Sequence, residues 1–370
     1  MILLPDGRKA GFISESGAPE PERLTPIDDG ARASAVLRMI QAGQVLLWTG
    51  DYRNGRALLQ ALRRRLNKER AGAQGRVGDQ DLAARWKSER QRAREGGELL
   101  GNITVLIEPG GELLLRRAPD TQKAVALAWG PSESSRVVAL NTLGGALSAA
   151  EWTEKGLDVP GLAGRITPRF GVFSPTRRAY VDLLEHLEVE RMTVLDVGTG
   201  TGVLAFVLLQ RGATSAVGTD TEERAVQCAR DNARALGLGD RFSAVQANLF
   251  PAGERFDCVV FNAPWVPETP RTALDRAVFD ENGDTLRRFL GGVTEHLNPE
   301  GVVALIVSDL PIRLGLREPG ALEAMVEAAG LRVLKLASVA ASHGRSGDTS
   351  DLLHEARSSE CVQLYVLARK

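Results

Sequence analysis

Cysteine and histidine are scarce in this sequence, which has three cysteines and four histidines among 370 residues. Cys228, Cys258 and Cys361 lie far apart. Their spacing fits neither a metal-binding motif nor a disulfide framework, and such cysteine usage is typical of a reducing compartment. We therefore expect a cytoplasmic protein with no metal centre.

The sequence also lacks long apolar segments and an excess of charge of one sign. It contains no uninterrupted apolar run of the roughly 18 residues needed to cross a bilayer, and the apolar run at its start is too short for a secretory signal. The formal net charge is −1, so the molecule as a whole is not built to bind polyanions. We expect no membrane association, and the length predicts two domains.

Residues 1–165 predict a smaller α+β domain that carries no recognisable chemistry. Residues 31–65 have the pattern of a helix, a short strand and a second helix. The runs NITVLIE and ELLLRRA are separated by Pro-Gly-Gly, which is a hairpin signal, and KAVALAWG is a third apolar run. Because no polar constellation stands out, we expect this part to act as a lid or recognition domain.

One feature of this domain is basic. Thirteen Lys or Arg residues lie between Arg53 and Arg94, including the triplet at positions 63–65. Such a stretch is either a surface for RNA phosphates or a solvated helix face with interspersed Glu. Since Trp86 is the sole aromatic residue in it, the pattern favours the solvated face.

Residues 166–370 differ in kind, because apolar strands alternate with amphipathic helices along this part. This alternation predicts a doubly wound, seven-stranded, mostly parallel sheet with helices on both faces, that is, a Rossmann-like α/β fold. Ligands of such sheets lie outside the carboxyl ends of the strands, where the strand order reverses. The seven predicted strands cover residues 192–198, 215–220, 242–250, 256–262, 301–309, 331–339 and 362–369.

A glycine-rich loop follows the first of these strands, in the sequence LDVGTGTGVLA. Its glycines, at positions 198, 200 and 202, allow a tight turn and close approach of a ligand to the backbone. Relative to a dinucleotide loop, the third glycine comes one position early, and Asp196 suits an ammonium group better than a pyrophosphate. Asp220, at the end of the second strand, stands where an acidic residue commonly binds ribose hydroxyls. Together these features predict a site for S-adenosylmethionine (SAM).

These motifs, with FNAPW at the end of the fourth strand, resemble class I SAM-dependent methyltransferases over residues 165–370. The segment GVFSPTRRAYVDLL and the FNAPW motif are similar to the branch with an Asn-Pro-Pro-aromatic motif, which includes protein-glutamine, rRNA guanine-N2 and adenine-N6 methyltransferases. The resemblance implies that Tyr180, a candidate catalytic residue, stacks on the cofactor and that Asn248 lies near the adenine amino group. It also implies further cofactor contacts from Phe173, Pro175 and Thr176.

The same resemblance gives roles to Asn262 and Trp265. The Asn262 oxygen and the carbonyl that follows it would accept hydrogen bonds from a planar amine, and Trp265 would stack on the group that bears it. We therefore expect N-methyl transfer to an amine or amide, with a small molecule as the favoured acceptor and RNA or protein as open alternatives. Ala263 stands where the motif has Pro, and it restricts the backbone less.

This departure keeps a second hypothesis open, in which SAM is the only substrate. The α-amine of SAM would attack its own γ-carbon, giving azetidine-2-carboxylate and methylthioadenosine, as in azetidine-2-carboxylate synthases of similar appearance. The Trp265 ring would then face the sulfonium through a cation–π contact.

Residues 340–360 form a long connection between the last two predicted strands. It carries His343, His354, Arg357 and Glu360, and the part from residue 351 has helical spacing. Long connections in compact domains are commonly functional. The connection either folds over the crevice or is a solvated loop.

Overall fold

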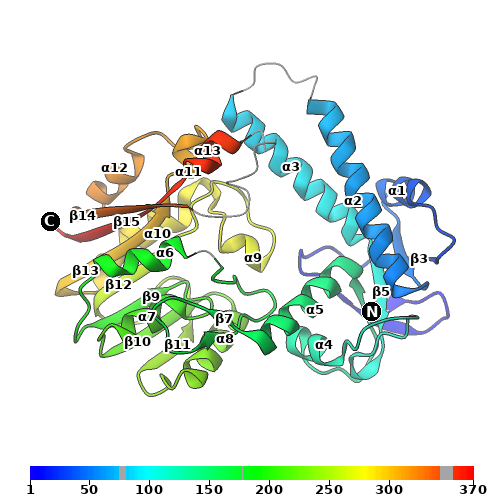
Figure 1. Cartoon of the computed structure of the whole chain (residues 1–370), viewed down its shortest axis with the longest axis horizontal. Coiled ribbons are helices and arrows are strands. Elements are labelled where there is room, and N and C mark those ends of the chain that lie inside the picture. Colours follow the sequence, from blue (N-terminus) through cyan, green and yellow to red (C-terminus); the bar gives the residue numbers. More distant parts are fainter. Residues whose placement is uncertain (75–80, 177, 342–352) are drawn as a thin grey trace. The chain divides into compact units, whose positions relative to one another are not determined.

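The computed structural model describes residues 1–74, 81–176, 178–341 and 353–370. The chain divides into two compact units, Met1–Glu151 and Trp152–Lys370 (Figure 1). The sequence-based division at residue 165 and the roles assigned to the two parts stay predictions. No helix in the described ranges is both long enough and apolar enough to cross a membrane.

The first unit is built on a six-stranded sheet in the order β1-β2-β6-β5-β4-β3. Strands β3, β4 and β5 are parallel, and β5 pairs with β6 in the antiparallel direction. The strands are β1 (Ile2–Leu3), β2 (Lys9–Ile13), β3 (Leu24–Ile27), β4 (Val45–Trp48), β5 (Ile103–Ile107) and β6 (Arg136–Ala139). The helices are α1 (Ala33–Gln41), α2 (Tyr52–Gln74), α3 (Leu82–Gly101), α4 (Gln122–Trp129) and α5 (Leu140–Lys155).

The hairpin predicted in this unit is wrong. Residues 103–107 do form β5, but its antiparallel partner is β6, and residues 112–118 are not a strand. The Pro-Gly-Gly sequence forms the short 3-10 helix η1 (Pro109–Gly111), and Leu114 is exposed to solvent. The third apolar run is helix α4. Periodicity over so few apolar residues did not separate a short helix from a strand.

The second unit contains the predicted seven-stranded sheet, in the order β11-β10-β9-β12-β13-β15-β14. Five adjacent strands are parallel, and β15 pairs antiparallel with β13 and β14. The strand order reverses between β9 and β12, as predicted. The strands are β9 (Thr193–Val197), β10 (Ser215–Asp220), β11 (Phe242–Gln246), β12 (Phe256–Asn262), β13 (Leu297–Ser308), β14 (Leu331–Ala340) and β15 (Cys361–Arg369).

Two apolar cores, one on each face, hold this sheet between helices, because alternate strand residues point to opposite sides. One core contains Val194 with residues of α6 (Ala179–Asp182), α7 (Val203–Gln210) and α8 (Glu223–Ala235). The other contains Leu195 with residues of α10 (Asp284–Val293) and α12 (Ala321–Ala328). Helices α7 and α10 therefore cover opposite faces of the sheet. The doubly wound prediction is confirmed.

Short elements complete the second unit. A two-stranded ribbon of β7 (Leu157–Asp158) and β8 (Arg165–Ile166) precedes the sheet. The remaining segments are η2 (Leu183–His186), α9 (Ala273–Arg276), η3 (Glu281–Gly283), η4 (Thr294–His296), α11 (Leu310–Arg313) and α13 (His354–Ser358).

Candidate functional site: a crevice at the carboxyl edge of the sheet

The parallel register brings three predicted site residues to one level. Asp196 of β9 pairs with Gly218 of β10 on one side and with Val260 of β12 on the other. Two residues further along each strand come Gly198, Asp220 and Asn262. The carboxyl ends of these strands therefore present the glycine loop between a carboxylate and an amide.

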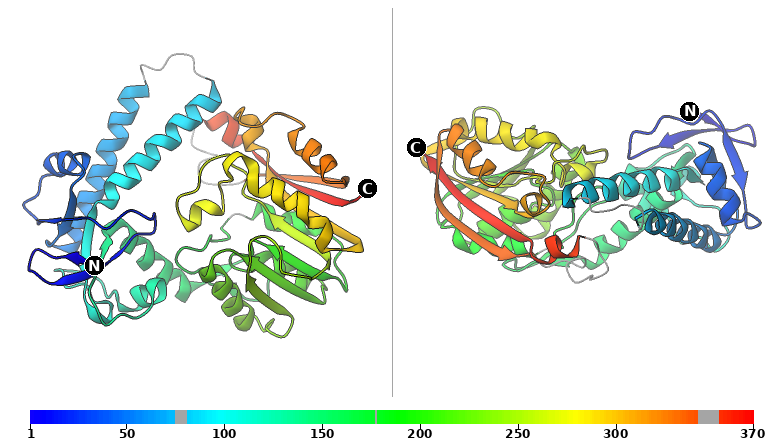
Figure 2. Two further views of the ribbon diagram at one scale, coloured as in Figure 1. Left: turned by 180° about the vertical axis from the view of Figure 1, so that it is seen from behind. Right: turned by 90° about the horizontal axis from the view of Figure 1, so that it is seen from above.

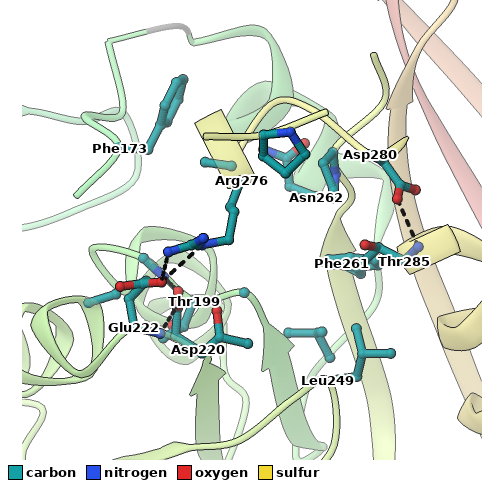
Figure 3. Close-up of a pocket in the computed structure, with 18 of the residues that line it drawn as sticks. Phe173, Thr199, Asp220, Glu222, Leu249, Phe261, Asn262, Arg276, Asp280 and Thr285 are labelled. Atoms are coloured by element: carbon teal, nitrogen blue, oxygen red, sulfur yellow. Dashed lines mark hydrogen bonds and ion pairs between the residues drawn. The ribbon is translucent and has the colours of Figure 1, made fainter. Parts of the chain in front are cut away.

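A cavity of about 770 Å³ opens at this edge. Figure 3 shows Phe173, Asp220 and Asn262 around it, and its volume is in the usual range for cofactor sites. Seven of the predicted site residues line it: Phe173, Tyr180, Gly198, Gly200, Asp220, Asn248 and Asn262. The register thus gathers the ends of four strands and the segment before β9 around one space.

Five other predicted residues do not line the cavity as the described residues define it: Asp196, Gly202, Pro175, Thr176 and Trp265. Thr176 is exposed, and Pro175 is buried. The Trp265 side chain is buried, whereas Pro264 before it does line the cavity. The structure therefore buries the Trp265 ring in the protein interior and does not bring it to the crevice.

The three glycines serve different purposes. Gly198 and Gly200 have φ angles of 65° and 55°, and added Cβ atoms would approach no atom closer than 3.6 Å and 3.9 Å respectively. At these two positions backbone conformation and cavity space explain glycine. Gly202 also has a positive φ, of 86°, but a Cβ there would lie 2.2 Å from Cζ of Phe206. Gly202 therefore permits close packing of the loop on α7.

Asp220 fastens the loop from the side of β10. Its Oδ2 accepts a hydrogen bond from the Gly200 amide at 3.1 Å, and its Oδ1 accepts one from the Glu222 amide at 3.0 Å. Burial raises the pKa of this carboxyl above its ordinary value. A carboxylate has about four lone-pair positions, so Asp220 keeps acceptor capacity on the cavity side.

Asp196 lies under the loop and is 1% exposed. Its Oδ2 accepts hydrogen bonds from Oγ1 of Thr199 at 2.8 Å and from the Ala205 amide at 3.2 Å. Its Oδ1 is buried and accepts no hydrogen bond from the described residues. Burial raises the pKa of Asp196 from 3.8 to about 7, and the neighbouring Asp220 contributes to the rise. An unpartnered buried carboxylate oxygen of this kind fits a cationic ligand group.

Asn262 ends β12 with a similar feature. Its Oδ1 is shielded from solvent and has no hydrogen-bond partner among the described residues. The next residue, Ala263, is fully buried and donates its backbone N–H to the carbonyl of Ile306 at 3.1 Å. Proline lacks this donor. The departure from the Pro-Pro sequence therefore replaces a ring constraint by a hydrogen bond to β13, and the backbone beside Asn262 stays held.

The segment from Val266 to Asp280 forms part of the cavity wall that sequence reasoning missed. Its base is closed by hydrogen bonds from the Val266 amide to Val278 and from the Asp280 amide to Val266. From its helix α9, Arg276 donates to Oε1 of Glu222 at 2.7 Å (Figure 3). The capping box of Thr272 and Asp275 is the sequence signal that could have located this helix.

Asp280 fixes the end of the same segment. It is 2% exposed, and its two oxygens accept hydrogen bonds from the Thr285 and Leu286 amides at 2.8 Å and 3.1 Å. This carboxylate satisfies the first amides of α10. It therefore ties the cavity wall to the helix behind it.

The predicted connection at 340–360 is described in part. His343 and the rest of residues 342–352 lie outside the described residues. Helix α13 follows, and Glu360 is buried, with Oε1 accepting a hydrogen bond from Oγ of Ser308 at 2.7 Å. Within residues 353–360, none lines the cavity. Whether this connection covers the crevice stays a prediction.

Across the described ranges, no group of three or more His, Cys, Asp or Glu side chains could hold a metal ion.

Comparisons with known proteins match the region of this site. Residues 171–263 match the family model of the ribosomal protein L11 methyltransferase. A protein N5-glutamine methyltransferase of Methanocaldococcus jannaschii is 27% identical over 42% of this chain and 80% of its own length. The release factor glutamine methyltransferase of Cereibacter sphaeroides is 34% identical over 38% and 52%. The ribosomal protein L11 methyltransferase of an Enterobacter species is 38% identical over 28% and 33%. The chain thus spans from a third to four fifths of the length of these relatives.

Solved structures resemble part of the chain. The ribosomal protein L11 methylase of Lactobacillus delbrueckii subsp. bulgaricus is 19% identical, with a TM-score of 0.36 over 52% of this chain and 76% of its own. A methyltransferase of Thiobacillus denitrificans in complex with S-adenosylhomocysteine is 13% identical, with a TM-score of 0.35 over 54% and 92%. The matches in sequence indicate an enzyme of the methyltransferase type with SAM as its cofactor.

The packing of the glycine loop gives a stability test. Gly202→Ala should lower the free energy of unfolding by about 3 kcal/mol, since it adds a clash with Phe206 to the cost of a positive φ. Gly237 has a φ of 68° and open space around its Cβ position, so Gly237→Ala should cost only about 1 kcal/mol. Urea denaturation measures both. Equal losses would mean that the Phe206 contact is relieved without cost.

The ion pair between Arg276 and Glu222 gives a test of cofactor retention. Both side chains line the cavity, but Arg276 is 51% and Glu222 32% exposed. Such a pair contributes at most about 1 kcal/mol. Arg276→Ala should therefore speed the dissociation of S-adenosylhomocysteine by up to about fivefold in stopped-flow measurements. The charge-swapped double variant, Arg276→Glu with Glu222→Arg, should restore slow dissociation. A single variant that releases the ligand at the wild-type rate would remove the pair from any such role.

Proposed function

We propose that this chain transfers the methyl group of SAM to the nitrogen of a side-chain amide in a protein of the translation apparatus. The observation that carries the proposal is the unpartnered Oδ1 of Asn262 at the cavity, level with Gly198 and Asp220. A buried acceptor without a donor is costly. An N–H group of an acceptor amide would satisfy it and would be held there.

On the cofactor side, the residues fit SAM. Asp220 has spare acceptor positions for ribose hydroxyls, and the unpartnered Oδ1 of Asp196 suits an amine. Gly198 and Gly200 leave the room that a close ligand requires. When bound, SAM supplies a methyl group on a sulfonium, which is already an excellent leaving group.

For the transfer itself, the chain contributes mainly positioning. Asn262 accepts a hydrogen bond from the amide N–H and turns the nitrogen lone pair toward the crevice, and the proton that the nitrogen loses on methylation passes to solvent. The bond from Ala263 to Ile306 fixes the backbone beside Asn262. Positioning of this kind is worth several kcal/mol of the barrier. The Val266–Asp280 segment, joined to Glu222 through Arg276, limits the access of water to this space.

The relatives support a protein acceptor. Of the three relatives described above by sequence, two are named for glutamine and one for ribosomal protein L11. The small-molecule acceptor favoured by sequence reasoning has no such support, and neither has cyclisation of SAM. Because the matches cover only parts of the relatives, the acceptor is part of the proposal.

Product analysis separates the possibilities. The purified chain is incubated with methyl-labelled SAM and total extract from cells that lack its gene. Label in protein that acid hydrolysis releases as methylamine supports methylation of an amide. Label confined to RNA or to small molecules contradicts the protein acceptor. Release of methylthioadenosine from SAM alone contradicts methyl transfer and supports cyclisation.

A pair of amide variants tests the two sides of the crevice. Asn262→Ala should lower kcat about a hundredfold with little change in the Kd of S-adenosylhomocysteine, because it removes a positioned hydrogen bond at the reacting centre. Asn248→Ala is the matched control, since its side chain lines the cavity near the end of β11. It should raise the Kd and leave kcat at saturating SAM nearly unchanged. Wild-type turnover in Asn262→Ala would reduce Asn262 to a strand-ending residue.

The raised pKa of Asp196 predicts a pH dependence of binding. An ionised carboxylate holds the amine of S-adenosylhomocysteine better than a neutral one, so affinity should rise with pH up to about 7 and level off above it. The free protein should behave oppositely. Its folded state keeps a proton that the unfolded chain releases near pH 3.8, so the free energy of unfolding should fall as pH rises toward about 7. Calorimetry and urea denaturation measure the two trends. Asp196→Asn should abolish both, and their persistence in that variant would exclude Asp196 as their source.

A further inference from the structure

Helix α2 of the first unit has a sharply divided surface. Its buried face consists of Tyr52 and four leucines that belong to the core of this unit: Leu58, Leu59, Leu62 and Leu66. Figures 1 and 2 show α2 alongside α3. The opposite face, between residues 53 and 68, is exposed and carries six cations and no carboxylate: Arg53, Arg56, Arg63, Arg64, Arg65 and Lys68.

These cations are not paired with acidic side chains in the part of the chain that the structure describes. None of the six forms an ion pair there, and only Arg56 forms a side-chain hydrogen bond, to Oη of Tyr52 at 3.1 Å. Other exposed helices of the chain pair their arginines with carboxylates one turn away, as in Arg234 with Asp231 and Arg288 with Asp284. The sequence pattern favours a solvated helix face with interspersed Glu over residues 53–94. Between residues 53 and 68 the described face of α2 carries no acidic residue, and the first Glu follows at position 69.

The lack of exposed apolar side chains and the type of cation on this face indicate which class of partner it suits. None of the large apolar side chains that are exposed in the described ranges lies on α2. Membrane insertion and typical protein interfaces both need apolar or aromatic anchors. Five of the six cations are arginines, whose guanidinium groups bind phosphate in a bidentate manner. Fifteen residues of helix separate Arg53 from Lys68, a length of about 22 Å, which spans several phosphates.

We propose that the exposed face of α2 binds the phosphate backbone of RNA and thereby holds the enzyme on an RNA-containing target. The choice of RNA over DNA rests on the proposed function, since a protein of the translation apparatus is presented by RNA-rich particles. Because the net charge of the chain is −1, binding depends on this local surface and not on overall attraction.

Fluorescence anisotropy with a fluorescein-labelled RNA hairpin tests the surface in the full chain. The variant Arg63→Ala/Arg64→Ala/Arg65→Ala should weaken binding at least about tenfold at moderate salt. The slope of log K against log salt should also fall by about 2 to 3, since each lost phosphate contact removes about 0.7 to 0.9. The matched control, Lys9→Ala/Arg23→Ala/Arg38→Ala, removes the same charge from exposed positions elsewhere in this unit and should change neither quantity.

Three results would overturn the proposal. In the first, the triple variant on α2 keeps the wild-type affinity and salt slope. In the second, the control triplet weakens binding equally, so that the effect comes from net charge. In the third, duplex DNA, polyglutamate or phosphatidylserine vesicles bind the wild-type chain more tightly than RNA does. Calorimetry with S-adenosylhomocysteine is carried out on every variant. Retained cofactor binding with lost RNA binding separates this surface from the crevice, and the proposed amide chemistry is judged independently by the labelled products.

Discussion

The parallel pairing of β9 with β10 and β12 is the constraint on which the site depends. It aligns Asp196, Gly218 and Val260 in one row across the sheet. The residues two positions further along each strand therefore reach the same carboxyl edge. Asp220, Gly198 and Asn262 are separated by 22 and 64 positions along the chain, yet the register alone makes them neighbours. A slip of one residue in either pairing would turn the Asp220 or Asn262 side chain to the other face of the sheet.

The loop between these strand ends is held mainly by groups that also belong to the site. Asp196 bonds to Thr199 and Ala205, and Asp220 bonds to the Gly200 amide. Both carboxylates therefore stabilise the loop, and Asp220 also lines the cavity. Burial destabilises the charged form of each carboxyl group, which raises both pKa values. A substitution of either carboxylate therefore changes the hydrogen bonds of the loop as well as the charge beside the cavity.

Sequence reasoning predicted the regular part of this architecture well, because repeated apolar strands and glycine spacing reflect local physics. It located all seven strands, the reversal of strand order and seven residues of the cavity wall. It failed where a contact is set by tertiary structure. The burial of the Trp265 side chain depends on packing beyond the end of β12, and the Arg276–Glu222 pair joins segments 54 residues apart. The wrongly predicted hairpin shows the same limit, since β5 pairs with β6, which follows helix α4 in the chain.

The hydrogen bond from Ala263 to Ile306 has a mechanical consequence. It extends the β12–β13 ladder one residue beyond Asn262, so the amide at the crevice belongs to the rigid centre of the sheet. The Val266–Asp280 segment lies outside the strands of this sheet, and its hydrogen bonds include those at its base, the pair of Arg276 with Glu222 and the bond from Thr269 to Glu281. Asn262 is therefore a fixed reference point at the crevice, because the sheet sets its position and the loops around it do not.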